Sequence, residues 1–141
     1  MIILDTNLIS EPLKPAPEAR VTQWLDGQRQ EQLFLTVISA AELLAGVEQM
    51  PLGRKRSALE DKIATVLHRF GEKRILAFDL PAARAYAVLR ARAREAGFGI
   101  TAMDAQIAAI AASRGFAVAT RDTVPFIAAG VKVINPWDSA A

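Results

Sequence analysis

Hydrophobic residues recur along the chain in short unbroken runs, and longer stretches of mixed polarity separate them. Five of these runs predict buried strands: Ile2 to Leu4, Leu33 to Thr36, Ile75 to Phe78, Phe116 to Thr120 and Val131 to Asn135. Continuous apolar strands are typical of a parallel sheet that is covered on both faces. The hydrophobic pattern therefore favours a layered fold in which helices lie on both sides of a sheet.

The stretches between these runs predict helices. They are Glu18 to Gln28, Ala40 to Met50, Arg54 to Phe70, Leu80 to Ala96 and Ala102 to Arg114. Proline in a first turn (Pro81) and glycine just past a last turn (Gly97 and Gly115) are the end signals expected of real helices. Strands that alternate with helices predict an α/β fold with a mainly parallel sheet.

Length and composition narrow the class of protein. The 141 residues contain no repeat, low-complexity tract or linker, so we expect a single domain over residues 1–141. Hydrophobic residues make up 52% and charged residues 23%, which excludes a disordered chain. The absence of cysteine excludes disulfides and thiolate metal sites. With no signal peptide and no membrane-spanning run, we expect a cytoplasmic protein, and its pI near 9.3 permits nucleic-acid binding.

Two acidic residues follow predicted strands. Asp5 comes directly after the first run, and Asp122 comes two residues after the end of the fourth. In open α/β sheets, ligands bind beyond the carboxyl ends of the strands, at the point where strand order reverses. Taken alone, each acid is also typical of a turn or a helix N-cap. Thr6 and Asn7 are predicted to cap the next helix and leave the Asp5 carboxylate free.

Two further acids lie where predicted helices begin. Glu42 comes three residues after Ser39, and Asp104 comes three residues after Thr101, so each is expected in a first helical turn. Both match capping patterns, in which Glu42 accepts a hydrogen bond from the Ser39 backbone N–H and Asp104 is favoured by the helix dipole. The functional alternative is that both acids face the same crevice as the two strand-end acids.

Four carboxylates in one crevice would repel one another and raise their pKa values unless a cation lay between them. Oxygen ligands without cysteine or a histidine cluster suit Mg²⁺ or Mn²⁺. Mg²⁺ retains several waters, one of which can become the nucleophile in phosphodiester hydrolysis. The single histidine, His68, has no acid or serine placed to form a triad, and no nucleotide-binding glycine motif occurs. The residues therefore favour metal-dependent phosphodiester hydrolysis.

Four segments, each with one of these acids, resemble the PIN domain family: MIILDTNLISEPLKP, SAAELLAGV, TAMDAQIAAIAA and ATRDTVPFIAAGVKVINPW. Within that family they are most similar to the VapC-type toxin ribonucleases, in the branch similar to FitB, over residues 1–137. The resemblance implies a three-layer α/β/α sandwich around a parallel five-stranded sheet. It also implies a Mg²⁺- or Mn²⁺-dependent endoribonuclease, the toxin of a type II toxin–antitoxin pair, which forms a homodimer and is blocked by a VapB-like antitoxin.

The resemblance also implies roles for individual residues. The acidic quartet that binds the metal and carries catalysis is Asp5, Glu42, Asp104 and Asp122. Asp5 and Asp104 are the most secure ligands. Glu42 and Asp122 act directly or through water. Asn7 and Thr120 are implied to be supporting polar residues near the metal.

Three arginines are candidates for contact with RNA phosphates. Arg121 is the basic residue nearest the expected site, and either substrate contact or pairing with a carboxylate would explain it. Arg90 and Arg94 belong to a basic run that is equally typical of a solvated helix face. The sequence leaves both alternatives open.

Other functional classes fit less well. A phosphotransferase of the haloacid-dehalogenase kind needs a second acid where the chain has Asn7, as well as a lysine after a later strand. A response-regulator receiver needs paired acids after the first strand, and Asp79 is a poor substitute for its phosphoacceptor. A non-catalytic RNA- or partner-binding domain, whose acids serve only as helix caps, stays open. The target RNA is not indicated by the sequence.

Overall fold

Five parallel strands form one sheet in the computed structural model, which describes residues 1–138. The strands are β1 (Ile2–Leu4), β2 (Leu33–Thr36), β3 (Ile75–Leu76), β4 (Ala117–Ala119) and β5 (Val133–Ile134). They lie in the order β3-β2-β1-β4-β5, and all neighbouring pairs are parallel. The predicted strands are all present, although the last three are shorter than predicted.

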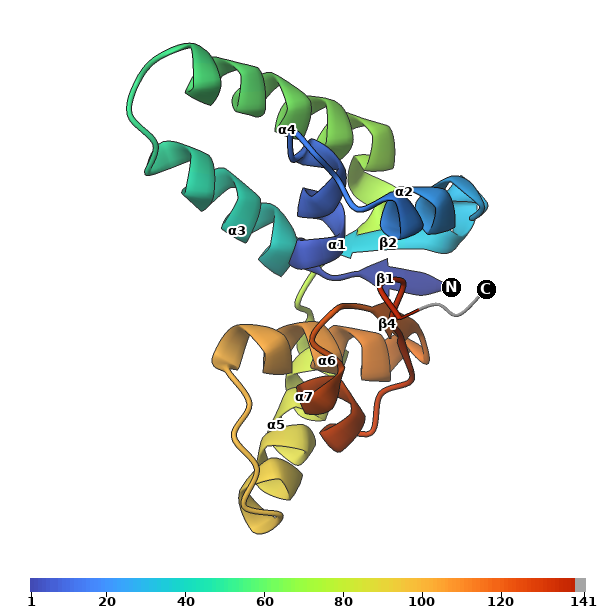
Figure 1. The fold of residues 1–141 in the computed structure, drawn as a ribbon. Coiled ribbons are helices and arrows are strands. Elements are labelled where there is room, and N and C mark those ends of the chain that lie inside the picture. Colours follow the sequence, from blue (N-terminus) through green and yellow to red (C-terminus); the bar gives the residue numbers. More distant parts are fainter. Residues whose placement is uncertain (139–141) are drawn as a thin grey trace.

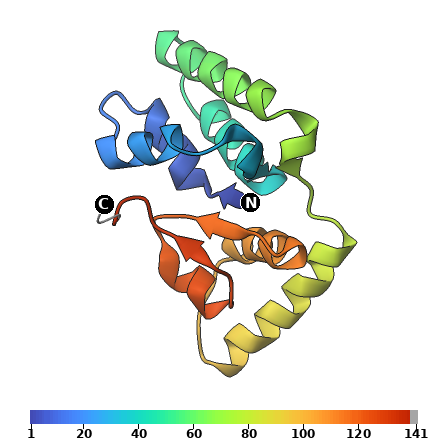
Figure 2. The same ribbon diagram turned by 90° about the vertical axis from the view of Figure 1, so that its right-hand side faces the viewer.

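Helices cover both faces of this sheet. Those within residues 1–138 are α1 (Thr6–Ser10), α2 (Ala19–Asp26), α3 (Val37–Glu48), α4 (Arg54–Arg74), α5 (Leu80–Glu95), α6 (Ala102–Arg114) and α7 (Thr123–Ala128), with the short 3-10 helices η1 (Glu11–Leu13) and η2 (Gln30–Gln32). The first four α-helices lie on one side of the strands and the last three on the other (Figure 1). The turned view shows the same two groups on either side of the sheet (Figure 2). The predicted three-layer α/β/α sandwich is confirmed.

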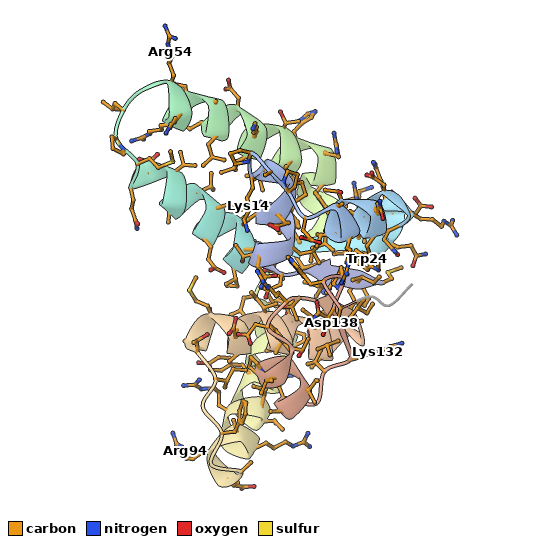
Figure 3. All side chains as sticks on the ribbon, in the orientation of Figure 1. Lys14, Trp24, Arg54, Arg94, Lys132 and Asp138 are labelled. Carbon is orange, nitrogen blue, oxygen red and sulfur yellow. The ribbon has the colours of Figure 1, made fainter. Side chains whose placement is uncertain are left out.

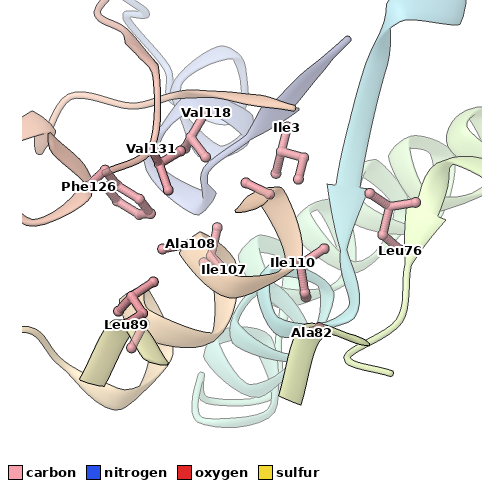
Figure 4. Close-up of a cluster of buried hydrophobic side chains, with 12 residues drawn as sticks. Ile3, Leu76, Ala82, Leu89, Ile107, Ala108, Ile110, Val118, Phe126 and Val131 are labelled. Carbon is pink, nitrogen blue, oxygen red and sulfur yellow. The ribbon is translucent and has the colours of Figure 1, made fainter. Parts of the chain in front are cut away.

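The alternation of side chains along the strands divides the core into two clusters. Ile3 and Val118 face α5, α6 and α7, whereas Leu4 and Ala119 face α1 to α4. Figure 4 shows the first cluster, in which Ile107 of α6 packs beneath the strands. The strand residues Ile3, Leu4 and Val118 are at most 3% exposed, and full burial of a large aliphatic side chain contributes about 1.5–3 kcal/mol. The ends of β1 and β4 are therefore held firmly in place.

The helix ends mostly follow the predicted signals. α6 begins after the N-cap Thr101 and ends at Gly115, which has a φ of 69° that favours glycine. α4 was predicted to end near Gly71; that residue has non-helical angles (φ 66°, ψ 175°), but helical bonding resumes as far as Arg74. In residues 1–138, no helix combines the length and the apolar character needed to cross a bilayer.

Candidate active site

All four predicted acids lie around one cavity. Its volume is about 310 Å³, and its lining residues are Asp5, Thr6, Asn7, Ser10, Glu42, Asp104 and Asp122. The acids come from four separate segments: the end of β1, the helices α3 and α6, and the start of α7. The cavity thus joins two residues predicted from strand ends with two predicted from helix starts.

The strand order explains why these segments meet. From β1 the chain builds β2 and β3 on one side, and it later returns to build β4 and β5 on the other. The reversal point is therefore between β1 and β4, where the Asp5 backbone N–H donates to the Ala119 carbonyl at 3.0 Å. Asp5 and Asp122 follow these two strands, so both lie at the carboxyl ends of the strands at the reversal point. This is the place where ligands bind in open α/β sheets.

Asp5 is buried and held by several donors. Only 5% of the residue is exposed. The Thr6 backbone N–H donates to Asp5 Oδ1 at 2.8 Å, and the Thr120 hydroxyl, which is fully buried, donates to Oδ2 at 2.7 Å. Asn7 Nδ2 lies 3.5 Å from the same Oδ2 atom. Asp5 itself is the N-cap of α1, so the expectation that Thr6 and Asn7 cap this helix was wrong.

Two of the acids have raised pKa values. Burial raises the pKa of Asp5, the hydrogen bonds from Thr120 and Thr6 partly oppose this, and the charges of Asp104 and Glu42 raise it further. Burial likewise raises the pKa of Asp104, against a hydrogen bond with Thr101, and repulsion from Asp122 adds to the increase. A cation in the cavity would offset both the burial and the repulsion of these carboxylates.

The capping role predicted for Glu42 is wrong. α3 begins three residues earlier than predicted, because Thr36 is its N-cap and accepts from the Ser39 backbone N–H at 3.2 Å. Glu42 therefore lies in the second turn, too far along the helix to cap it. Its Oε1 atom instead accepts a hydrogen bond of 2.8 Å from the Thr6 hydroxyl, across the cavity. The structural explanation that competed with a functional role for Glu42 is thus removed.

Asp104 and Asp122 differ in their backbone settings. Asp104 is in the first turn of α6 as predicted, and its backbone N–H donates to the Thr101 hydroxyl at 3.1 Å. Asp122 occupies the N-cap position of α7, but its side chain makes no capping hydrogen bond. Its backbone N–H donates to Thr120 Oγ1 at 3.1 Å. The hydroxyl of Thr120 consequently ties the segment of Asp122 to the carboxylate of Asp5.

The three arginines lie in different surroundings. Arg121 is exposed; its backbone N–H donates to Asn7 Oδ1 of the cavity lining at 3.4 Å, and its guanidinium lies 5.6 Å from the centre of the Trp137 ring. Arg90 donates to the Ile100 carbonyl at 2.7 Å. Arg94 lies at the free end of α5, at the opposite extreme of the molecule from Arg54 (Figure 3). Arg90 and Arg94 line a separate cavity of about 190 Å³, so the structure does not bring them to the acids.

A larger, mostly apolar groove adjoins the acidic cavity. Its volume is about 510 Å³, and it shares Thr6, Ser10 and Glu42 with the cavity. Leu43 and Val47 of α3 are among its apolar lining residues. Neither this groove nor the position of Thr6 and Ser10 in the cavity lining was predicted from the sequence. The available signal was their position: both fall in the five residues that follow Asp5.

The donor set fits a hard divalent cation. Every acid around the cavity offers carboxylate oxygens, and no cysteine or histidine lines it. Within residues 1–138, no three such side chains converge closely enough to hold an ion as they are placed. The arrangement therefore fits a hydrated ion with few direct protein ligands better than a closed protein cage. A hydrated ion of this kind is the usual form of a Mg²⁺ site.

Comparison with known proteins gives a family and several close relatives. The family model described as "PIN domain" matches residues 2–131. Three relatives align over nearly their whole lengths: plasmid stability protein StbB of Pseudomonas syringae pv. tomato (48% identical, 99% of this chain and 100% of the relative), VapC ribonuclease Y4jK of Sinorhizobium fredii (46%, 99% and 100%) and toxin FitB of Neisseria gonorrhoeae (45%, 97% and 99%).

Solved structures also resemble the chain. The crystal structure of FitAcB from Neisseria gonorrhoeae contains a chain that is 45% identical, with a TM-score of 0.93 and coverage of 99% of this chain and 100% of that one. A member of the VapBC family of toxin-antitoxin systems from Mycobacterium tuberculosis, VapBC-5, is 28% identical, with a TM-score of 0.65 and coverage of 94% and 96%. The similarity thus extends through both the sequence and the fold.

Proposed function

The chain belongs to the PIN domain family, and from that premise we propose that it is a metal-dependent endoribonuclease and the toxin of a type II toxin–antitoxin system of the VapBC kind. The relatives named VapC ribonuclease and toxin FitB support both parts of the proposal. The observation that carries it is the single cavity lined by all four acids. We treat residues 1–141 as one domain because a single sheet includes strands from residue 2 to residue 134.

In this proposal the acids hold a Mg²⁺ or Mn²⁺ ion. Asp5 and Asp104 would bind it directly, and Glu42 and Asp122 would bind it directly or through water. When bound, such an ion would supply Lewis-acid chemistry, neutralising phosphate charge and lowering the pKa of a water molecule for phosphodiester hydrolysis. The hydroxyl of Thr120 supports the site by fixing Asp5 in one orientation.

Polar and basic residues around the cavity then orient the RNA. Asn7 supports the same carboxylate of Asp5 and accepts from the Arg121 backbone N–H at 3.4 Å. Arg121 is proposed to contact a phosphate next to the scissile one, since it is exposed at the edge of the acids. Arg90 and Arg94 are assigned to more distant phosphates, a weaker role, because they lie around a separate cavity.

An antitoxin protein is the proposed partner, in line with the toxin-antitoxin system named for one solved relative. The apolar groove beside the acids supports this assignment. It shares Thr6, Ser10 and Glu42 with the acidic cavity, so a VapB-like chain bound in the groove would cover the route to the metal. Masking of the site by the partner would keep the toxin inactive until the partner is removed.

We also propose that the toxin is a homodimer and acts in the cytoplasm. Large apolar side chains are exposed on α3 (Leu44, 50%) and on α5 (Leu80, 61%, and Val88, 53%), and a second copy could cover such surfaces. A chain without cysteine suits a reducing compartment. Light scattering on the purified toxin, free of its partner, would test the dimer directly.

The deciding experiment is RNA cleavage by the purified chain in Mg²⁺, in Mn²⁺ and in EDTA. We expect cleavage only with metal, and we expect Asp104→Asn to abolish it without loss of folding. Asp61→Asn is the matched control, because Asp61 is an exposed acid on α4 that does not line the cavity. If wild type and Asp104→Asn were both inert but still bound RNA or a partner, the non-catalytic binding domain would replace the nuclease.

A further inference from the structure

Thr6 connects two of the acids through hydrogen bonds. Its backbone N–H donates to Asp5 Oδ1 at 2.8 Å, and its hydroxyl lies 2.8 Å from Glu42 Oε1. This N–H is available because the first amide of a helix has no partner within the helix. Among the hydrogen bonds of residues 1–138, only those of Thr6 join the side chains of two members of the quartet. Thr6 is therefore placed to control the spacing between Asp5 and Glu42.

The direction of the hydroxyl contacts follows from chemistry. Thr6 Oγ1 lies 2.9 Å from Ser39 Oγ as well as 2.8 Å from Glu42 Oε1. A hydroxyl has one proton to donate, and an ionised carboxylate can only accept. The Thr6 proton is thus directed to Glu42, and the buried Ser39 hydroxyl donates to Thr6. This relay of Ser39, Thr6 and Glu42 anchors the carboxylate to a side chain with no solvent exposure.

Glu42 depends on this anchor for its position. It lies in the second turn of α3, it is only partly buried, and no other side-chain hydrogen bond involves it within residues 1–138. A free glutamate samples several rotamers, and ordering it carries an entropy cost. Because the Thr6 hydroxyl already orders the Glu42 side chain in the folded protein, part of that entropy cost is not incurred again when a ligand binds.

We propose that Thr6 is a positioning residue, which holds Glu42 against Asp5 and thereby increases the affinity of this side of the cavity for a divalent cation. The inference rests on the proposed function, since it assumes that the acids bind a metal. Hydrogen-bond partners that orient metal ligands typically change metal affinity or activity by about 10–100-fold when they are removed. Thr6 would act through the carboxylate and would not touch the ion or the RNA.

The first test measures Mn²⁺ binding to the full chain by calorimetry. Thr6→Val keeps the branched shape and loses the hydroxyl, and we expect about tenfold weaker binding. Thr6→Ser keeps the hydroxyl and should restore the affinity to within about threefold of wild type. Thr22→Val is the matched control on α2, where the hydroxyl bonds only a nearby backbone carbonyl, and it should bind Mn²⁺ like wild type.

A double-mutant cycle then separates positioning from a general structural role. In a Glu42→Ala background, loss of the Thr6 hydroxyl should no longer weaken Mn²⁺ binding, because the carboxylate that it positions is gone. Thr6→Ala serves as a second variant in the same cycle should Thr6→Val fail to fold, as judged by circular dichroism. In cleavage assays, loss of the hydroxyl should lower kcat and leave the KM for RNA unchanged.

Two results would overturn the proposal for Thr6 alone: wild-type affinity in the folded hydroxyl-free variants, or an equal loss of affinity with and without Glu42. A wild-type chain that binds no Mn²⁺ and cleaves no RNA would instead reject the proposed function. The two failures are therefore distinguishable in the same set of titrations.

Discussion

The acids of the cavity and the arginines of α5 are both groups of like charge. The fold brings the acids together, whereas it leaves the arginines on different sides of one helix. The acids are far apart in the sequence and meet around one cavity. Arg90, Arg92 and Arg94 occupy alternate positions of one short run, but a helix advances 100° per residue, so Arg92 faces a different side from the other two. Closeness along the chain therefore says little about which charges act together.

The difference comes from what holds each group. The acid positions depend on strand ends fixed by the sheet and by two packed cores, and Asp5 is 5% exposed. The arginines are on the outer surface of a helix, where long side chains are solvated and one of them, Arg90, already bonds the Ile100 carbonyl. At the cavity, repulsion from neighbouring acids adds to the raised pKa values of Asp5 and Asp104, and a cation there would offset it.

The largest expected effect separates these two groups directly. Asp5→Asn should lower the rate of RNA cleavage by at least about a thousandfold, because the charge stabilisation that a metal supplies amounts to several kcal/mol. Arg94→Ala should change the rate by less than about twofold, the scale of a solvated surface charge. Initial rates at saturating Mg²⁺ measure both. Comparable losses in the two variants would remove the distinction between the cavity and the helix.

A second effect concerns stability. Mn²⁺ at a hundred times its dissociation constant should stabilise the folded chain by about 2.7 kcal/mol, which raises the Tm by several degrees. We expect Asp104→Asn to abolish this increase and Arg90→Ala to preserve it, in calorimetric melts with and without the ion. An equal Tm increase in Asp104→Asn would show that the ion binds elsewhere.

Arg121 provides an intermediate case, because it is a surface arginine next to the acids. Arg121→Ala should raise the KM for RNA about threefold to tenfold. Loss of one phosphate contact should also reduce the slope of log K against log salt concentration by about one. Arg94→Ala, which removes a more distant and weaker phosphate contact, should change both quantities less than Arg121→Ala does. Steady-state kinetics at several salt concentrations would show whether position beside the cavity, and not charge alone, decides the effect.

The smallest expected effect involves a buried acid that is paired with a cation. The 2.7 Å ion pair with Lys14 holds the pKa of Glu11 below its usual range. A lowered folded-state pKa adds stability above the unfolded value of 4.5, and this stability is lost as the pH falls through the folded value. Glu11→Gln should thus be less stable than wild type at pH 7, with the difference fading in acid.

The control for that experiment is Glu95→Gln, an exposed acid on α5, which should match wild type across the same pH range. Urea unfolding at several pH values gives the comparison. A difference between Glu11→Gln and wild type that does not change with pH would contradict the ion-pair explanation and point to packing.

Hydrophobic pattern alone predicted the five strands and the parallel sheet, because buried parallel strands are apolar on both faces. It gave no residue range for α1 or α7, which have five and six residues and are too short to be stable without the tertiary contacts that hold them. The capping role of Glu42 was wrong because Thr36, three residues before Ser39, is also a good N-cap. Sequence spacing could not choose between two such caps.

The positions of the four acids were predictable from strand ends and helix starts, but their partners were not. The Thr6–Glu42 hydrogen bond crosses 36 positions of sequence, and the Thr120–Asp5 bond crosses 115. Such contacts depend on the exact packing of α3 and β4 around β1, and neither periodicity nor motif spacing contains that information.

The central claim is that the four acids form one metal centre, and anomalous diffraction from crystals soaked in Mn²⁺ tests it most directly. We predict an anomalous peak inside the acidic cavity, about 2 Å from carboxylate oxygens of Asp5 and Asp104, as expected for a small divalent cation. Asp104→Asn crystals under the same conditions should lose the peak. A cavity without a peak in the wild-type protein, or manganese bound only elsewhere, would contradict the account.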